Sequence, residues 1–278
     1  MISQLRNPFL KKIIRNSILF SLLTALTVHP IYATKKTTPT SKEVSNRVTK
    51  KVAAKPFVTK SKKTNRDFKL IYNSKTKHIL HGIHTKEKMI SLTFDDGPEP
   101  KMTPIILELL KEHQIKATFF VIGSNCKKYP DILKQIEADG HEIANHSWSH
   151  RVFSKLSNAA IANELRDTTA EVKRHNVKIS NWFRAPYGNL SANQAKYVHE
   201  LGYRTLHWNV DTRDWSGISD AEMMRIFRKQ FKPGSVVLMH TLLGRKNKPS
   251  HLPSLLNELI PEYQKKGYQF VTATELVN

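Results

Sequence analysis

From Met89 to the end of the chain, short runs of apolar residues alternate with longer stretches whose apolar residues recur at helical spacing. A short apolar run between turn signals predicts a buried strand, and apolar residues three and four positions apart predict one face of a helix. Seven runs predict strands: Met89 to Phe94, Thr118 to Ile122, Glu142 to Ala144, Trp182-Phe183, Tyr203 to Trp208, Ser235 to Met239 and Tyr268 to Thr272. Six stretches predict helices: Met102 to His113, Asp131 to Asp139, Asn158 to His175, Ala192 to Leu201, Asp220 to Phe231 and Pro253 to Lys266.

Strands and helices that take turns in this way predict a parallel sheet with helices packed outside it. Gly140, Gly202 and Gly267 each follow a predicted helix, where a residue in the left-handed conformation commonly ends the helix. The predicted fold class is therefore α/β, a closed or nearly closed (β/α) barrel with about seven parallel strands. Phe68 to Ile83 alternates weakly between apolar and polar residues and predicts a hairpin that leads into the barrel.

The chain ahead of the barrel divides into two segments of different composition. Residues 1–33 have basic residues, then the apolar run Ser17 to Val28, then the small residue Ala33, which is typical of a signal peptide. The run is shorter than the roughly 20 apolar residues of a membrane span, so cleavage is favoured over a permanent signal anchor, the alternative that Ile13 and Ile14 leave open. Residues 34–67 are rich in Lys and Thr and predict a disordered, basic linker. Residues 68–278 form the predicted ordered domain, with its core at 86–278.

The charge balance predicts an anionic partner. The chain has 45 Lys and Arg against 23 Asp and Glu, a net charge of +22, and much of it falls in the linker. Such charge attracts nucleic acid, anionic membrane surfaces or acidic wall polymers. Export to the periplasm, cell wall or extracellular space argues against nucleic acid and favours an envelope polymer or the membrane surface. Cys126 is the one cysteine of the sequence, which excludes an internal disulfide and a Cys-x-x-Cys metal site; it is predicted to be a small buried residue.

Polar, titratable residues follow most of the predicted strands. The carboxyl ends of the strands of an α/β barrel meet at one mouth, where functional groups gather. These residues are Asp95 and Asp96, His146 and His150, Arg184, Asp211 and Asp214, and His240. We expect the adjacent acids Asp95 and Asp96 to lie just past the strand end, where Gly97-Pro98 turns the chain and both carboxylates can face a cleft.

His146 and His150 have the spacing of metal ligands. At positions i and i+4 of a helical turn, both imidazoles lie on one face and can reach one ion. Two histidines and one carboxylate leave open positions for water, which is the layout of a catalytic zinc site. The residue types alone do not show which of the two acids is the ligand.

Five short motifs carry a specific resemblance. They are Thr93-Phe94-Asp95-Asp96-Gly97, His146-Ser147-x-x-His150, Arg184-x-Pro186-Tyr187, Asp211-x-x-Asp214-Trp215 and Leu238-x-His240. In this order, from about Met89 to the C-terminus, they resemble the signatures of the polysaccharide deacetylases of carbohydrate esterase family four. The resemblance implies a distorted β/α barrel and the metal-dependent removal of acetyl groups from N-acetylated sugars, which makes residues 68–278 the catalytic domain.

The resemblance also implies a role for each site residue. Asp96, His146 and His150 would bind Zn²⁺ or another divalent metal such as Co²⁺, and Asp95 would be the general base. His240 would be the general acid, held by Asp214, with Asp211 as the alternative partner, and Arg184 would position Asp95. The backbone N–H of Tyr187 would stabilise the oxyanion. Trp215 and Leu238 would join Tyr187 in binding the substrate, forming the pocket for the acetyl methyl group.

The predicted substrate is N-acetylglucosamine in an envelope polysaccharide, with peptidoglycan first. Members of the family that act on muramic acid tend to replace the ligand acid, and this chain keeps both acids. Thr241 stands where the family often has Asp, so contacts near His240 differ. The alternatives are an N-deacetylase of chitooligosaccharide or exopolysaccharide, an acetylxylan esterase, and a non-catalytic basic wall-binding protein. The oligomeric state is left open.

Overall fold

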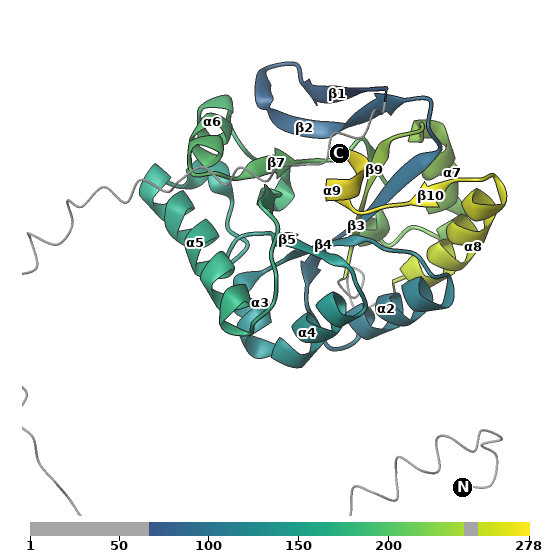
Figure 1. Cartoon of the computed structure of the whole chain (residues 1–278), viewed down its shortest axis with the longest axis horizontal. Coiled ribbons are helices and arrows are strands. Elements are labelled where there is room, and N and C mark those ends of the chain that lie inside the picture. The colour runs from purple at the N-terminus through teal and green to yellow at the C-terminus, as the bar shows by residue number, and fades with distance from the viewer. Residues whose placement is uncertain (1–66, 242–249) are drawn as a thin grey trace, which may run out of the picture. The chain divides into compact units, whose positions relative to one another are not determined.

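Seven strands form a closed ring in the computed structural model, which describes residues 67–241 and 250–278 (Figure 1). Around the ring they are β2 (Thr76–Thr85), β7 (Arg204–Leu206), β6 (Trp182–Phe183), β5 (Glu142–Asn145), β4 (Thr118–Val121), β3 (Met89–Gly97) and β9 (Ser235–His240). Neighbours from β2 through β7 to β9 pair in parallel, and Gly82 of β2 closes the ring antiparallel to Ser235 of β9. The predicted distorted α/β barrel is confirmed.

The strands that form the ring are not the seven that the apolar runs predict. All seven runs contain strands, but the last one, β10 (Gln269–Phe270), pairs with Met89 and Ile90 at the start of β3 and stays off the ring. Its place is taken by β2, the second strand of the predicted lead-in hairpin, which pairs antiparallel with β1 (Phe68–Asn73). A further two-residue strand, β8 (Val210–Asp211), pairs with β9 and was not predicted.

The six predicted helices are present, each within one residue of its expected ends: α2 (Met102–Glu112), α4 (Pro130–Ala138), α5 (Asn158–Arg174), α6 (Ala192–Glu200), α7 (Asp220–Gln230) and α8 (Leu252–Lys265). Gly140, Gly202 and Gly267 follow α4, α6 and α8 with φ of 80°, 91° and 82°, as a left-handed helix end requires. Two short helices, α3 (Gly123–Lys128) and α9 (Ala273–Leu276), were not predicted. Each has fewer residues than two helical turns, so its sequence shows no periodicity.

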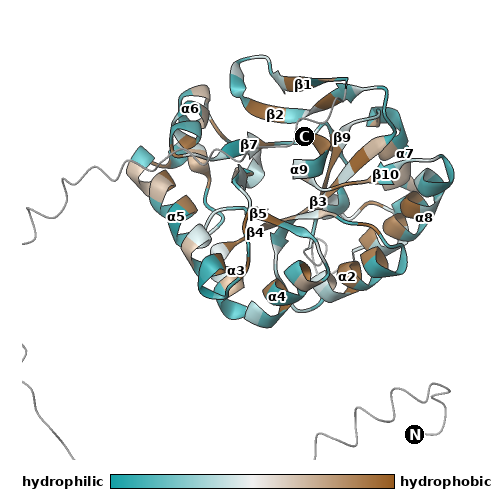
Figure 2. Cartoon of the chain, viewed as in Figure 1, coloured by the Kyte–Doolittle hydropathy of each residue, from teal (hydrophilic) through white to brown (hydrophobic). Residues whose placement is uncertain are grey.

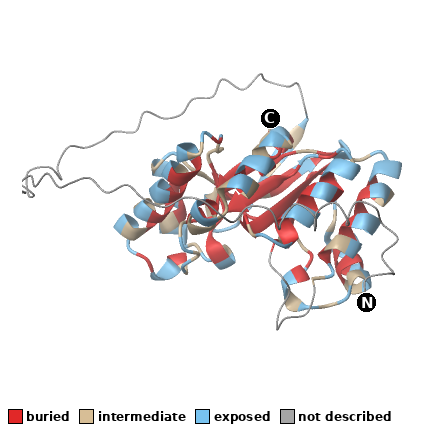
Figure 3. Ribbon diagram, turned by 90° about the horizontal axis from the view of Figure 1, so that it is seen from below, coloured by how far each residue is buried: buried red, intermediate tan, exposed pale blue. Residues whose placement is uncertain are grey.

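The core lies between the strands and the inner faces of the helices. Apolar residues occupy the strands, while the helices are mixed, with polar residues on their outer sides (Figure 2). Burial follows the same division, since the strands are buried and the outer helix faces are exposed (Figure 3). Phe94, Phe119 and Trp182 are among the largest buried side chains, and Cys126 is buried as predicted. A rigid scaffold therefore surrounds the strand ends that carry the candidate residues.

The predicted signal peptide at residues 1–33 and all but the end of the predicted linker at 34–67 lie outside the described residues. Within residues 67–241 and 250–278, no helix is both long enough and apolar enough to span a membrane.

Candidate metal centre and active site

A pocket of about 740 Å³ opens where the strands β3 and β9 end and the loops after β4, β5 and β6 converge. Its lining includes nine of the residues singled out from the sequence: Asp95, Asp96, His146, His150, Tyr187, Asp211, Trp215, Leu238 and His240. Five lining residues were not predicted: Ile122, Asn125, Ala185, Gly188 and Trp208. The five motifs are thus brought to one place from across about 150 residues of sequence.

The adjacent acids lie inside β3, not past its end as expected. The strand runs through Gly97, and its pairing with β4 shifts register between Asp95 and Gly97. Asp96 sits in this irregularity with φ of 76°, a left-handed backbone that a residue with a side chain rarely adopts. In a regular strand, neighbouring side chains point to opposite faces. The bulge at Asp96 breaks that alternation, which explains how both carboxylates line the same pocket.

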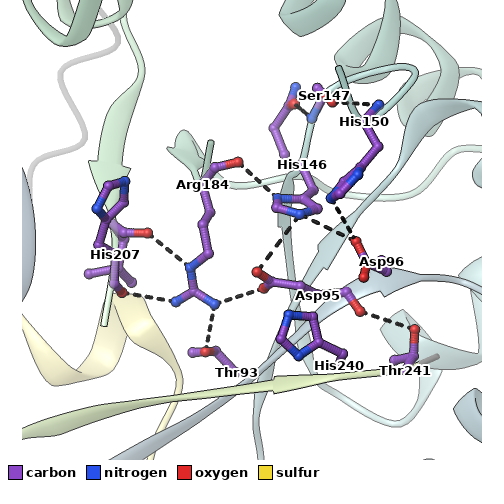
Figure 4. A network of polar contacts seen from close by, with 12 residues as sticks. Thr93, Asp95, Asp96, His146, Ser147, His150, Arg184, His207, His240 and Thr241 are labelled. Carbon is purple, nitrogen blue, oxygen red and sulfur yellow. Dashed lines mark hydrogen bonds and ion pairs between the residues drawn. The ribbon is translucent and has the colours of Figure 1, made fainter. Parts of the chain in front are cut away.

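Arg184 fixes Asp95 from below the pocket. Its Nη1 donates to Asp95 Oδ1 at 2.7 Å and to Thr93 Oγ1 at 2.8 Å, while Nε and Nη2 donate to the carbonyls of Leu206 and His207 at 3.0 Å each (Figure 4). The guanidinium is fully buried, and it lies 4.1 Å from the centre of the Phe120 ring. Burial lowers the pKa of Arg184, and the Asp95 carboxylate opposes that effect. Charge-assisted bonds in such surroundings hold a carboxylate in one orientation.

Asp96, His146 and His150 present one ligand atom each within 4.8 Å of one another. Asp96 Oδ1 lies 3.4 Å from His146 Nε2 and 3.1 Å from His150 Nε2. Zinc bonds of roughly 2.0–2.1 Å in a tetrahedral site place neighbouring ligand atoms about 3.3 Å apart. The spacing of the two imidazoles from the carboxylate therefore fits a small divalent cation held by all three.

Two further observations fit a cation at this place. His146 Nδ1 lies 2.8 Å from the Arg184 carbonyl, which can only accept, so Nδ1 carries a proton and Nε2 is the ring nitrogen that faces Asp96 and can bind a cation. Asp96 Oδ1 is buried and faces the Nε2 atoms of both imidazoles. Burial raises the pKa of Asp96, but His146 and His150 outweigh it and hold that pKa well below its usual range. The carboxylate is thus ionised, as a metal ligand must be.

The segment that carries the two histidines is a loop, so the predicted helical turn is wrong. His146 directly follows β5, and both Ser147 and His150 have left-handed backbones with φ of 71° and 55°. Asn145 Oδ1 accepts from the Ser147 amide at 2.8 Å, and Ser147 Oγ accepts from the His150 amide at 3.0 Å. The imidazole rings lie 5.0 Å apart because these bonds fold the loop back. Each left-handed residue costs about 1–3 kcal/mol, which the surrounding contacts must offset.

His240 is paired with Asp214 on the far side of Asp95. His240 Nδ1 lies 3.0 Å from Asp214 Oδ1, and the His240 amide donates to Asp214 Oδ2 at 2.7 Å. Burial lowers the pKa of His240, but the hydrogen bond and charge of Asp214, with Asp95 and Asp96 nearby, raise it to about 9. Asp211 instead accepts from the Arg213 amide at 2.9 Å. The structure therefore places Asp214, and not Asp211, against the His240 ring.

Tyr187 stands at the pocket rim. Its backbone is left-handed with φ of 60°, and among the described residues none accepts a hydrogen bond from its N–H. Its side chain is 67% exposed and its ring packs edge-on against His150 at 4.7 Å. An unpaired backbone donor beside the candidate ligands is available to a bound oxyanion.

The pocket walls contain both predicted and unexpected apolar groups. Leu238 is buried and Trp215 is 42% exposed. Trp208 packs so closely on Gly188 that a side chain at Gly188 would come within 2.8 Å of the indole. Asn125 on α3 donates from Nδ2 to the Asp96 carbonyl at 2.8 Å. Neither Asn125 nor Trp208 belongs to a motif with a chemical signature, so the sequence carried no signal for them beyond their closeness to strand ends.

Comparison with known proteins identifies the family. A family model described as polysaccharide deacetylase matches residues 82–206. Two peptidoglycan-N-acetylglucosamine deacetylases of Bacillus cereus are 39% identical over 187 residues and 35% identical over 204 residues. The first match covers 66% of each chain, just under two thirds, and the second covers 73% of this chain and 94% of the relative. This chain belongs to the polysaccharide deacetylase family.

Other members of the polysaccharide deacetylase family differ in length and in the substrate that they are named for. A chitooligosaccharide deacetylase of Rhizobium leguminosarum is 34% identical, over 55% of this chain and 72% of the relative. This chain spans only 39% of the length of the peptidoglycan-N-acetylglucosamine deacetylase of Listeria monocytogenes.

Solved structures of the polysaccharide deacetylase family share the fold and include an inactive member. A peptidoglycan N-acetylglucosamine deacetylase has a TM-score of 0.65 and 34% identity, covering 70% of this chain and 91% of its own. A protein of Bacillus anthracis described as a pseudoenzyme of carbohydrate esterase family 4 has a TM-score of 0.66 and 29% identity, covering 72% and 69%. Because the same fold occurs in both, activity in this family depends on the residues of the site.

Proposed function

We propose that this protein hydrolyses the N-acetyl amide of N-acetylglucosamine residues in an envelope polysaccharide, with peptidoglycan as the first substrate, and releases acetate. One observation carries the proposal: a single pocket contains a three-ligand group, an Arg184-bound carboxylate and an Asp214-bound imidazole. Amide hydrolysis needs a nucleophile, a site for the oxyanion and a proton for the departing amine. Each of these needs has a group in the pocket that can meet it.

Asp96, His146 and His150 would hold the metal, with Zn²⁺ first and Co²⁺ as a substitute, because two imidazoles and a carboxylate form a donor set typical of catalytic zinc. Bound there, the cation would polarise the acetyl carbonyl and lower the pKa of a water molecule. Asp95 accepts a proton from the attacking water as the water oxygen bonds to the carbonyl carbon. Arg184 keeps the carboxylate aimed at the pocket and leaves its Oδ2, which lies 3.8 Å from His146 Nε2, free to accept the proton.

The remaining steps use Tyr187 and His240. The Tyr187 N–H donates to the developing oxyanion, an interaction worth about 3 kcal/mol in comparable sites. His240, kept protonated by Asp214, donates its Nε2 proton to the amine nitrogen as the carbon–nitrogen bond breaks. The products are acetate and a glucosamine residue with a free amine. Leu238 and Trp215 line the pocket and provide an apolar surface for the acetyl methyl group.

The choice of polymer rests on the relatives and on the sequence. The two B. cereus relatives are named for peptidoglycan, while the R. leguminosarum relative is named for chitooligosaccharide. The signal-peptide pattern of residues 1–33 supports export to the periplasm, cell wall or exterior, where peptidoglycan is found. The basic residues of 34–67 would then lie along anionic wall polymer or membrane surface.

The test is acetate release by the purified chain from peptidoglycan, N-acetylchitooligosaccharide and acetylated xylan, each before and after chelation of metal. We expect release from peptidoglycan, loss on chelation, and recovery when Zn²⁺ or Co²⁺ is added back. Release from xylan alone would identify an acetylxylan esterase, and release from chitooligosaccharide alone a chitin-type deacetylase.

A non-catalytic wall-binding role is the second candidate, because the family includes a pseudoenzyme and the chain has a net charge of +22. Asp95→Asn and His146→Ala separate the two functions. A wall-binding protein would still bind the wall in both variants, and its wild-type form would release no acetate. The proposed enzyme loses acetate release in both.

A further inference from the structure

Glu164 on α5 contacts the histidine loop, defined as residues 146–150. Its Oε2 accepts from the Trp148 amide at 2.9 Å and from the Ser149 amide at 2.8 Å, and its Oε1 accepts from Ser149 Oγ at 2.6 Å. Glu164 is only 8% exposed, which is unusual for a glutamate. All three bonds run from the loop to one carboxylate, 14 residues further along the chain than His150.

The opposite side of the histidine loop is held by the beginning of α3. The amides of Gly123 and Ser124 donate to the carbonyls of Ser147 and Trp148, both at 3.0 Å. Gly123 admits this approach because a Cβ there would lie 2.5 Å from the Trp148 ring and 2.7 Å from Thr168 Oγ1. The loop thus has its carbonyls bound to α3 and its amides bound to Glu164.

These hydrogen bonds matter because the histidine loop has no regular secondary structure. Residues 146–150 belong to no helix or strand, and two of the five residues have left-handed backbones. His150 is also the more exposed of the two histidines, with 26% of its side chain accessible against 2% for His146. His146 is further fixed by the Arg184 carbonyl, whereas His150 is held by the loop and by the contact of its ring with Tyr187.

We infer that Glu164 is the positioning residue for His150 and thereby sets how tightly the Asp96–His146–His150 site binds its divalent cation. This inference rests on the proposed metal site. Loss of the carboxylate leaves the amides of Trp148 and Ser149 and the Ser149 hydroxyl without their acceptor in the protein, so the loop relaxes and His150 loses its place opposite Asp96. Residues that orient a metal ligand typically change metal affinity by 10- to 100-fold when removed.

The experiment is titration of the metal-free full chain with Co²⁺, followed by its visible absorption. We expect Glu164→Ala to raise the Kd for Co²⁺ by about 10- to 100-fold. Glu164→Asp keeps the charge but is one methylene too short for all three donors, so it should raise the Kd by about 10-fold. Glu164→Gln should stay within about 5-fold, because its amide oxygen accepts two N–H groups and its amide nitrogen can donate to Ser149 Oγ.

Glu171→Ala is the matched control. Glu171 is a second buried glutamate on α5, 3% exposed, but it bonds to Arg174 and His175 and not to the histidine loop. Its loss should leave the Kd for Co²⁺ within about 2-fold, although it should lower the melting temperature, as loss of a buried group does. At saturating Co²⁺, Glu164→Ala should recover most of the wild-type kcat, a recovery that a general folding defect would not give.

An unchanged Kd in Glu164→Ala would overturn the inference and leave the proposed function standing. An equal rise in Glu171→Ala would overturn it too, because the effect would then come from the helix as a whole. If Glu164→Ala does not fold, Glu164→Asp and Glu164→Gln decide in the same way: equal Kd values in both would reject positioning by acceptor geometry. A wild-type chain that binds no Co²⁺ would overturn the proposed function and this inference together.

Discussion

Replacing Asp214 by Asn should move the alkaline limb of the pH–rate profile to lower pH. With His240 as the proposed general acid, activity should be present below its pKa and be lost as the pH rises through it. That pKa is raised to about 9, and Asp214 provides the hydrogen bond and the nearest charge that raise it. In Asp214→Asn the new side chain has one carbonyl oxygen for two donors, the His240 amide and Nδ1, and no charge. Burial lowers the pKa of His240, and in the variant less remains to oppose that effect.

The magnitude follows from the contact distance. An opposite charge within hydrogen-bond reach shifts a pKa by about 1–3 units, or roughly 1.4–4 kcal/mol. With Asp214 Oδ1 at 3.0 Å from Nδ1, we expect the alkaline limb to fall by that amount. A cation at Asp96 cancels that carboxylate's share, so the limb of the loaded wild-type enzyme should lie at or somewhat below about 9. A two-unit shift makes the variant about tenfold slower at pH 8 and restores much of its rate near pH 6.

The assay is kcat/KM for acetate release from pH 5 to 10 with saturating metal, on wild type, Asp214→Asn and Asp211→Asn. Asp211, at the end of β8, also lines the pocket but accepts from the Arg213 amide, so its variant is the control and should keep the wild-type limb. A limb that stays in place in Asp214→Asn, with a uniform loss of rate at every pH, would refute the assignment of His240 as the acid. Movement of the limb in Asp211→Asn would refute the assignment of its partner.

Three further predictions concern single residues. Asp95→Asn should lower kcat by about 10²- to 10⁴-fold while Co²⁺ still binds with near wild-type Kd, and loss of metal binding would show that Asp95 is a ligand. His146→Ala should raise the Kd for Co²⁺ by at least about 100-fold, since it removes a ligand itself, and acetate release that persists without metal binding would contradict the mechanism. Arg184→Ala should lower the free energy of unfolding by about 3–5 kcal/mol in urea titration, because it leaves the buried Asp95 charge unpaired, and a loss below about 1 kcal/mol would show that water takes its place.

The fold was predictable where local sequence and tertiary structure agree. The six long helices have apolar faces at helical spacing, and three of them, α4, α6 and α8, have a glycine just past their ends. Both signals act within a few residues. The closing strand was not predictable in the same way. β2 reaches the ring through the pairing of Gly82 with Ser235, which lie 153 residues apart in sequence and show no pattern that links them.

The site was predictable as a list of residues more than as a geometry. Asp96, His146 and His150 gather as the motifs indicated, and Asp214 meets His240. The conformations of these segments depend on distant partners. Asp96 occupies a bulge against β4, and the histidine loop is shaped by Asn145, Glu164 and α3 in place of a helical turn. Asn125 and Trp208 line the pocket but belong to no motif. Asn125 bonds to a backbone carbonyl and Trp208 packs against Gly188, and neither contact requires a particular spacing in the sequence.

The burial of Arg184 links the orientation of the Asp95 carboxylate to the stability of the fold. Besides Asp95, its guanidinium binds Thr93 within β3 and the carbonyls of Leu206 and His207 at the end of β7. The orientation of the Asp95 carboxylate is therefore fixed when the chain folds, before substrate binds. Natural variants that have lost catalysis but still fold should therefore keep Arg184 and differ at other residues of the pocket. Substitution of Arg184 would lower the stability of the fold as well as the activity.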